Sequence, residues 1–183
     1  RIAGVKVAAV ASADPAQLSG DLSKVAGNLG GPGDVMDFRG IETFSDWWEA
    51  AVCPAAEVID ICLPTCLHAE AAIAALEAGK HVLVEKPMAL DSRSAGAMID
   101  AARASGRILM VAQVLRFFPA YKALAGAVRS GKLGAIRMAE FRRRSAAPRW
   151  SSWLLDPAQS GGAVLDLLIH DIDICLHLFG KPD

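Results

Sequence analysis

Short apolar runs alternate with longer segments of helical periodicity along the first two thirds of the chain. The apolar runs, each of strand length, are residues 5–11, 40–44, 58–63, 81–85 and 108–112. Residues 68–78 and 91–105 have helical length and are followed by Gly79 and Gly106, which are typical helix stops. This alternation predicts right-handed βαβ units and an α/β fold with a doubly wound, parallel, Rossmann-type sheet.

Two short helices are expected near the N-terminus. The sequence Ser-Ala-Asp-Pro at residues 12–15 puts a proline where the first turn of a helix tolerates it. Ser45 is expected to cap a helix that carries Trp47 and Trp48. The glycine-rich residues 30–33 do not join a strand to a helix, so we expect a loop there.

The pattern changes after residue 115. Residues 119–129 form a helical segment before Gly131, and residues 135–144 alternate as a half-exposed antiparallel strand does. We therefore expect one domain over residues 1–115 and a second domain, α+β with an antiparallel sheet, that begins at residue 116.

Ionisable residues occur in a C-terminal segment that is otherwise apolar enough to be buried, residues 161–177. On a regular helix, four of them share a stripe about 60° wide: Asp166, His170, Asp173 and His177. Asp171 lies off this stripe. The pattern predicts a helix packed on most sides, with one polar line facing a cleft or a paired network. The alternative is an i,i+4 ion pair between Asp166 and His170 that only stabilises the helix.

A second polar signal follows the apolar run at residues 81–85. Glu85, Lys86 and Pro87 end this expected strand abruptly. Ligands of open parallel sheets bind at the carboxyl ends of the strands, so Lys86 lies at an expected binding site. Two separate signals therefore favour a functional interpretation of the polar helix.

Composition narrows the function classes. The 183 residues are 53% hydrophobic, enough to bury a core for one domain or one and a half. The longest apolar run falls far short of the roughly 20 residues that span a membrane. With 19 basic and 20 acidic residues, no strong field attracts nucleic acid, and no signal peptide is recognised. We expect a soluble, cytoplasmic protein without nucleic-acid or membrane partners.

The four cysteines, Cys53, Cys62, Cys66 and Cys175, lack repeated C-x-x-C spacing and are expected to be reduced thiols. Cys62 and Cys66 lie near His68, but no fourth ligand is close in the sequence. No metal site is therefore predicted.

Three motifs follow one another along the chain. Residues 58–87 contain a Pro-x-x-x-His turn and end in Glu-Lys-Pro, residues 116–119 are Arg-Phe-Phe-Pro, and residues 161–170 are Gly-Gly-x-x-x-Asp-x-x-x-His. Together they resemble the Gfo/Idh/MocA family of NAD(P)-dependent oxidoreductases, which act mostly on sugars, cyclic polyols and related carbonyl compounds. Three motifs in the right order are more specific than any one of them.

The resemblance implies that Lys86, Asp166 and His170 are the catalytic residues. A neutral imidazole at position 170 would remove the hydroxyl proton of an alcohol while hydride leaves its carbon. Asp166 would orient that imidazole or bind a neighbouring hydroxyl, and Lys86 would stabilise the developing alkoxide. Members of the family differ over which residue accepts the proton, so Lys86 and His170 both remain candidates.

Substrate contacts are expected at Arg116, Trp153 and Asp173. Trp150 and Trp153 could stack on a sugar ring, although ordinary packing is as plausible. The arginines at positions 142–144 could bind an anionic substrate, but a solvated strand end is the favoured interpretation.

The same resemblance implies an NAD or NADP cofactor on the first domain. The expected cofactor contacts are Ser12, Pro64, Thr65, His68, Glu85 and Lys86. Thr65 stands where the family often has Asn, and Ser12 where it often has an acidic residue for the adenosine ribose. Asp14 lies two positions on and no Arg adjoins Ser12, so NAD and NADP both stay open.

The family also has segments that this sequence does not contain. It opens with a strand and a Gly-rich turn that hold the pyrophosphate, and it continues past residue 183 with most of an antiparallel sheet. We therefore expect residues 1–115 to be a dinucleotide-binding domain incomplete at its N-terminus, and residues 116–183 to be the beginning of a substrate-binding domain.

The leading hypothesis is an oxidoreductase that transfers a hydride between NAD(P) and a secondary alcohol or carbonyl of a sugar, cyclic polyol or diol. One alternative is an NAD-dependent glycoside hydrolase of the same fold. Another is a non-catalytic, truncated relative whose polar stripe packs against another chain. The expected partners are a small-molecule substrate and further copies in a homo-oligomer.

Overall fold

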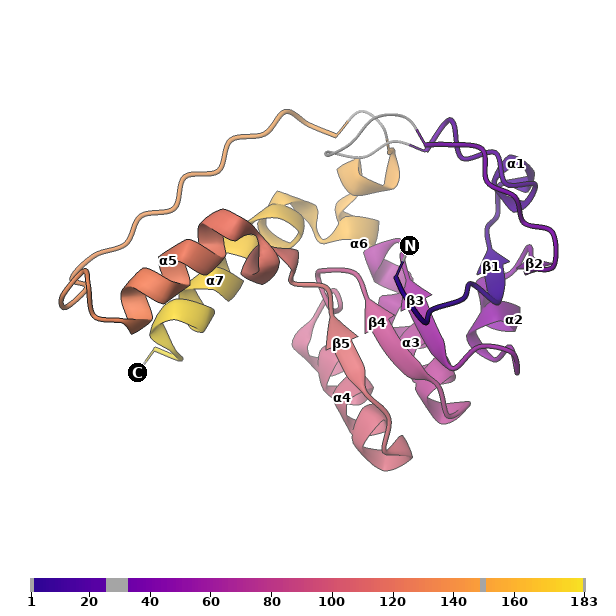
Figure 1. Ribbon diagram of the computed structural model, residues 1–183, viewed down its shortest axis with the longest axis horizontal. Coiled ribbons are helices and arrows are strands. Elements are labelled where there is room, and N and C mark those ends of the chain that lie inside the picture. Colours follow the sequence, from indigo (N-terminus) through magenta and orange to yellow (C-terminus); the bar gives the residue numbers. More distant parts are fainter. Residues whose placement is uncertain (1, 26–32, 149–150, 183) are drawn as a thin grey trace.

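Parallel strands and their connecting helices form the first half of the computed structural model, which describes residues 2–25, 33–148 and 151–182 (Figure 1). The strands are β1 (Ala9–Ala11), β2 (Glu42–Phe44), β3 (Val58–Ile61), β4 (His81–Val84) and β5 (Leu109–Val111). β1 pairs with β2, and β3, β4 and β5 form a second sheet in that order, with every pairing parallel. The predicted parallel α/β fold is confirmed.

Helices α3 (Thr65–Glu77) and α4 (Ser92–Ser105) cover one face of the three-stranded sheet (Figure 1). α3 presents alanines to the core, and small side chains let a helix approach its neighbours closely. Larger side chains then fill the space between the helices and β4: Leu76, Met98, Val82 and Val84, each at most 2% exposed. This core holds the carboxyl ends of β3 and β4 in a fixed position.

Helix α4 begins and ends where its capping residues predict. The Asp91 carboxylate accepts a hydrogen bond of 2.8 Å from the Ser94 N–H, which satisfies a free donor of the first turn. Gly106 ends the helix with φ +64°, a left-handed conformation that favours glycine.

The N-terminal elements differ in detail from the predictions. Only Ala9–Ala11 of the predicted strand at residues 5–11 pair with a neighbour, and Val5 and Val7 are more than half exposed. Helix α1 (Pro15–Leu18) begins with its proline, as predicted. α2 (Trp47–Ala51) is capped by Asp46, which accepts from the Trp48 N–H, and not by Ser45. The prediction was wrong by one residue because serine and aspartate cap equally well.

The second half begins with a 3-10 turn, η1 (Val114–Phe117), which leads from β5 to α5 (Pro119–Arg129). The remaining elements are the 3-10 turn η2 (Trp153–Leu155), α6 (Pro157–Ser160), the π-helical turn η3 (Val164–Leu168) and α7 (Ile169–Phe179). α5 and α7 pack side by side (Figure 1).

The antiparallel strand predicted at residues 135–144 is wrong. Residues 135–148 belong to no helix or strand, and Figure 1 shows them as an extended segment that runs apart from both sheets. Alternating polarity cannot make a strand without a neighbouring edge to pair with, and none of the described strands pairs with this segment. The domain boundary at residue 116 stays a prediction.

Residues 30–32 of the glycine-rich stretch, and Trp150, lie outside the described residues. Within the described ranges, every helix is too short or too polar to cross a membrane.

Candidate active site

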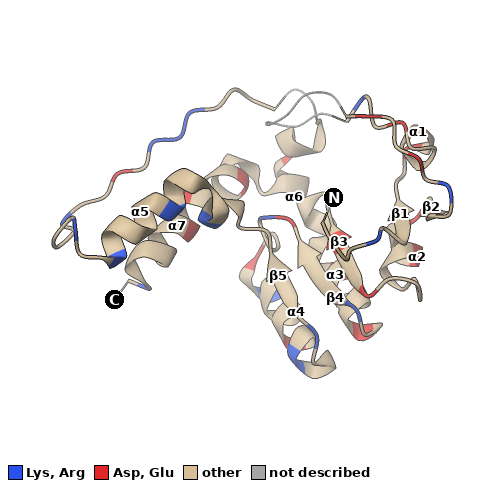
Figure 2. Ribbon diagram, viewed as in Figure 1, with Lys and Arg blue, Asp and Glu red and all other residues tan. Residues whose placement is uncertain are grey.

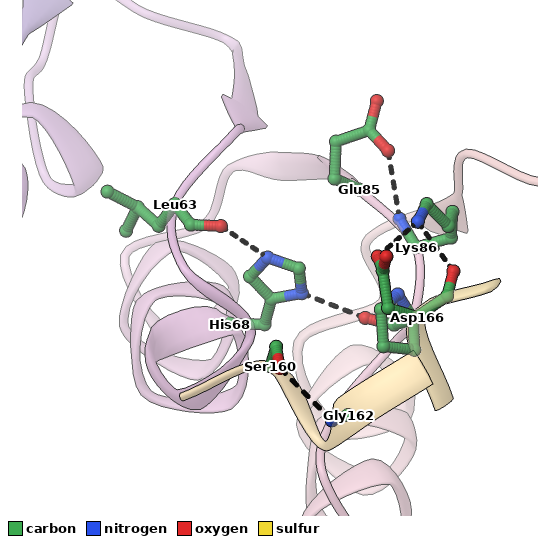
Figure 3. A network of polar contacts seen from close by, with 8 residues as sticks. Leu63, His68, Glu85, Lys86, Ser160, Gly162 and Asp166 are labelled. Atoms are coloured by element: carbon green, nitrogen blue, oxygen red, sulfur yellow. Dashed lines mark hydrogen bonds and ion pairs between the residues drawn. The ribbon is translucent and has the colours of Figure 1, made fainter. Parts of the chain in front are cut away.

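The end of β4 meets turn η3 at an ion pair (Figure 3). Lys86 Nζ donates to Asp166 Oδ1 at 2.6 Å and to the main-chain oxygen of Asp166 at 2.8 Å. The two side chains are 18% and 24% exposed, so water screens the attraction only partly. An ammonium has three N–H donors, and this arrangement leaves one for a ligand.

The π-helical turn changes the register of the predicted polar stripe. The stripe assumed a regular helix over residues 161–177, but η3 winds more loosely and rotates Asp166 relative to α7. Asp166 pairs with Lys86, and the alternative ion pair between Asp166 and His170 does not form in the described structure. The regular helix assumed over residues 161–177 is therefore wrong at η3, while the catalytic candidates Lys86 and Asp166 do come together.

His170 lies in the first turn of α7, and its Nδ1 is buried without a hydrogen-bond partner among the described residues. Burial lowers the pKa of His170 below its usual 6.5, and the positive charges of Lys86 and Arg143 lower it further. Asp166 and Asp171 act in the opposite direction with less effect. The imidazole is consequently neutral at pH 7 and able to accept a proton.

Two arginine–aspartate pairs anchor α7. Arg116 Nε donates to Asp173 Oδ2 at 2.8 Å, and its Nη2 donates to the other carboxylate oxygen. Arg143 binds Asp171 in the same way, at 3.1 and 2.7 Å. The two aspartate side chains are only 10% and 12% exposed, and these contacts raise the pKa of both arginines. Figure 2 shows basic positions on α5 and along residues 135–148, and acidic positions on α7.

These ion pairs change the roles that the sequence predicted for several residues. Arg116 and Asp173, both predicted as substrate contacts, bind each other. Within the arginine cluster, Arg143 ties the extended segment to α7, while the exposed Arg142 pairs with Glu140. Sequence reasoning missed Asp171 because it lies off the stripe, although a buried aspartate always needs a partner.

His68 is 1% exposed in α3 and bridges two backbone segments (Figure 3). Its Nδ1 lies 2.9 Å from the Pro87 carbonyl oxygen, and its Nε2 lies 2.8 Å from the Leu63 carbonyl oxygen. Both ring nitrogens are therefore engaged, and the ring joins the end of β3 to the turn that carries Lys86. Neither nitrogen is free to bind a metal together with Cys62 and Cys66.

The other predicted cofactor residues follow the carboxyl ends of strands. Pro64 and the buried Thr65 begin α3 after β3, and the half-buried Glu85 follows β4. Ser12 follows β1, where its hydroxyl donates to Gln17 Oε1 at 2.8 Å and accepts from the Asp14 N–H at 3.1 Å. The Asp14 carboxylate caps α1 and is already bonded to the Ala16 N–H.

Two further predicted residues make no hydrogen bond to the ion pair within the described residues. Trp153 is half-buried in η2. His177, the last member of the predicted stripe, accepts a hydrogen bond of 2.8 Å from Arg129 Nη2 at the contact between α5 and α7.

Two family profiles match the chain. The profile described as "Oxidoreductase family, NAD-binding Rossmann fold" matches residues 22–113, and that of the "GFO/IDH/MocA C-terminal domain" matches residues 121–183. Together they account for most of the sequence.

Several known dehydrogenases are similar to the chain. D-glucoside 3-dehydrogenase of Escherichia coli is 35% identical over 128 residues, which are 69% of this chain and 36% of that protein. Levoglucosan dehydrogenase of Pseudarthrobacter phenanthrenivorans is 37% identical over 142 residues, 75% of this chain and 36% of that protein. The chain thus spans about a third of the length of these relatives.

A solved structure of levoglucosan dehydrogenase in complex with NADH and levoglucosan has the same arrangement. It aligns with a TM-score of 0.73 and 30% identity, covering 96% of this chain and 45% of that one, so the two chains share their fold over this part.

Proposed function

Because the chain belongs to the GFO/IDH/MocA family of oxidoreductases, we propose that its protein transfers a hydride between NAD(P) and a secondary alcohol or carbonyl of a sugar, cyclic polyol or diol. The observation that carries the proposal is the partly buried Lys86–Asp166 ion pair beside a neutral His170. The names of the similar dehydrogenases support the substrate class.

The residues at this edge of the sheet fit a nicotinamide cofactor. Polar side chains follow three neighbouring parallel strands there, and one of them, Gln113 after β5, has a buried amide oxygen without a partner in the described structure. Pro64, Thr65 and Glu85 would line the nicotinamide half, and Ser12 the adenosine ribose. The cofactor, when bound, accepts the hydride from the substrate carbon.

His68, which is also expected to contact the cofactor, holds this edge together. Its ring has no free nitrogen, since the Leu63 and Pro87 carbonyl groups occupy both. Pro87 directly follows Lys86, so the ring fixes the turn from which the lysine side chain projects.

His170 acts as the base in alcohol oxidation. Its low pKa keeps the imidazole unprotonated at neutral pH, so it can take the hydroxyl proton as the hydride leaves. Lys86 is an unfavourable base in this arrangement, because its ammonium donates two hydrogen bonds to Asp166.

Lys86 and Asp166 act electrostatically. The free N–H of Lys86 can bind the substrate oxygen, where negative charge develops as its proton departs. Asp166 keeps the ammonium in position through two of its own oxygens, and its negative charge limits the effect of Lys86 on His170.

The test is steady-state reduction of NAD⁺ and NADP⁺ by glucosides, levoglucosan and cyclic polyols, with the complete protein. Lys86→Ala is expected to lower kcat by about 10²–10³-fold, the usual effect of removing a donor to a developing oxyanion. His170→Ala is expected to lower kcat by roughly 10²–10⁴-fold.

Lys132→Ala is the matched control, because Lys132 is exposed in the turn after α5 and is not among the residues bonded to Lys86 or Asp166 in the described structure. It should leave kcat unchanged. The absence of turnover with every sugar, polyol and diol in the wild-type protein would contradict the proposed function.

A further inference from the structure

Among the described residues, two buried polar side-chain atoms have no hydrogen-bond partner: Gln113 Oε1 and His170 Nδ1. Buried polar groups in native proteins are almost always bonded, so each exception needs an explanation. His170 already has a part in the proposed reaction, whereas Gln113 has none.

Gln113 lies where the three-stranded sheet meets the second half of the chain. Val84 of β4 is opposite Val111 of β5, and the Ala112 N–H donates to the Val84 carbonyl oxygen at 2.8 Å. The first residues beyond this ladder are Glu85 and Lys86 on one strand and Gln113 on the other. The amide therefore belongs to the same edge of the sheet as the lysine.

The backbone around Gln113 is held in place from both sides. The Val114 N–H bonds the Ala112 carbonyl oxygen at 2.8 Å across Gln113, whose φ of −76° and ψ of 71° are those of an inverse γ-turn. Turn η1 begins at the next residue and packs against α7, to which the Arg116–Asp173 pair fixes it. A rigid frame thus connects the amide to the helix that carries His170.

We propose that Gln113 binds the ligand of this site, its amide oxygen accepting a hydrogen bond from an O–H or N–H group. The donor is a hydroxyl of the polyol substrate or the carboxamide N–H of the nicotinamide. This inference rests on the proposed function. A buried acceptor that no described residue satisfies also selects against ligands that lack the donor, because these would leave it unpaired.

The test compares Gln113→Met with the wild type in the complete protein. Methionine keeps the length of the side chain but removes its polar atoms. Removing a group that supports the fold lowers the melting temperature. Removing an acceptor that has no hydrogen-bond partner leaves no other group unpaired and should not lower it. The melting temperature of the ligand-free variant is expected to stay the same or rise.

Ligand binding is expected to weaken about ten-fold, the effect of one lost hydrogen bond of this kind. A higher Kd for NADH, measured by fluorescence without substrate, identifies the carboxamide as the donor. A higher KM for the polyol at saturating cofactor, with the NADH Kd unchanged, identifies a substrate hydroxyl. Either result supports the proposal.

Two further variants complete the experiment. Gln113→Glu keeps an acceptor oxygen at the same position and should retain binding, which assigns the effect of Gln113→Met to the lost acceptor. If the Met variant does not fold, Gln113→Leu, which also lacks the acceptor, replaces it. Gln159→Met removes an amide that already bonds Asp156 and should not affect binding.

An active wild type whose Gln113→Met variant binds cofactor and polyol normally would overturn this inference and leave the proposed function intact. A wild type that neither binds NADH nor turns over any polyol would instead overturn both.

Discussion

The charge of His170 depends on four charged neighbours as well as on burial. Lys86 and Arg143 lower its pKa, and Asp166 and Asp171 raise it. The base must be unprotonated, so activity rises with pH through the pKa of this histidine. The acidic limb of kcat/KM is therefore expected below pH 6.5, the usual pKa of the group.

Arg143→Gln is predicted to move that limb to higher pH. The substitution removes a positive charge near His170 and leaves the Asp171 carboxylate uncompensated, and both changes raise the pKa of the imidazole. A pH profile of kcat/KM measures the shift. Arg142→Gln is the control, since Arg142 is exposed and bonds Glu140. A limb that stays in place in the Arg143 variant would mean that another group is titrating.

At the scale of single elements, the packed helices and the parallel strands were the most predictable features. Alanine-rich α3 and the Asp91 and Gly106 signals of α4 are local patterns whose consequences the core reinforces. The position of Lys86 at the carboxyl edge of the sheet could be predicted because the residue closely follows a buried strand. The π-helical turn could not, since it forms where Asp166 meets a lysine 80 residues away in sequence.

The His68 bridge joins two elements and yields a prediction about both. His68→Leu leaves the carbonyl group that accepts the ring N–H, of Leu63 or Pro87 according to the tautomer, without its bond, so the free energy of unfolding should fall by about 1–3 kcal/mol. Because Pro87 follows Lys86, kcat should fall as well, while the KM for the polyol changes less. Denaturant unfolding and steady-state kinetics measure the two effects.

His81→Leu is the matched control, because His81 makes one hydrogen bond, from the Ile108 N–H, at the opposite end of β4. It should cost less stability and leave kcat unchanged. If His68→Leu were as stable and active as the wild type, the bridge would have no role in holding the lysine.

At the scale of the whole molecule, the site joins two halves of the chain that the sequence pattern already distinguished. Lys86 comes from the parallel sheet, and Asp166 and His170 come from the C-terminal helical segment. The arginine pairs that fix this segment could not be predicted, because Arg116 and Arg143 reach α7 from distant parts of the sequence. Cytoplasmic location, homo-oligomerisation and the choice between NAD and NADP stay predictions.

Direct hydride transfer is the central claim, and deuterium transfer tests it most directly. A polyol deuterated at the carbon that bears the reacting hydroxyl is incubated with the complete protein and NAD(P)⁺, and the reduced cofactor is analysed by mass spectrometry. We expect one deuterium in each reduced cofactor, which forms about 10²–10³-fold more slowly with Lys86→Ala. A cofactor that stays oxidised while the protein converts its substrate, as in a glycoside hydrolase of the same fold, would contradict the account.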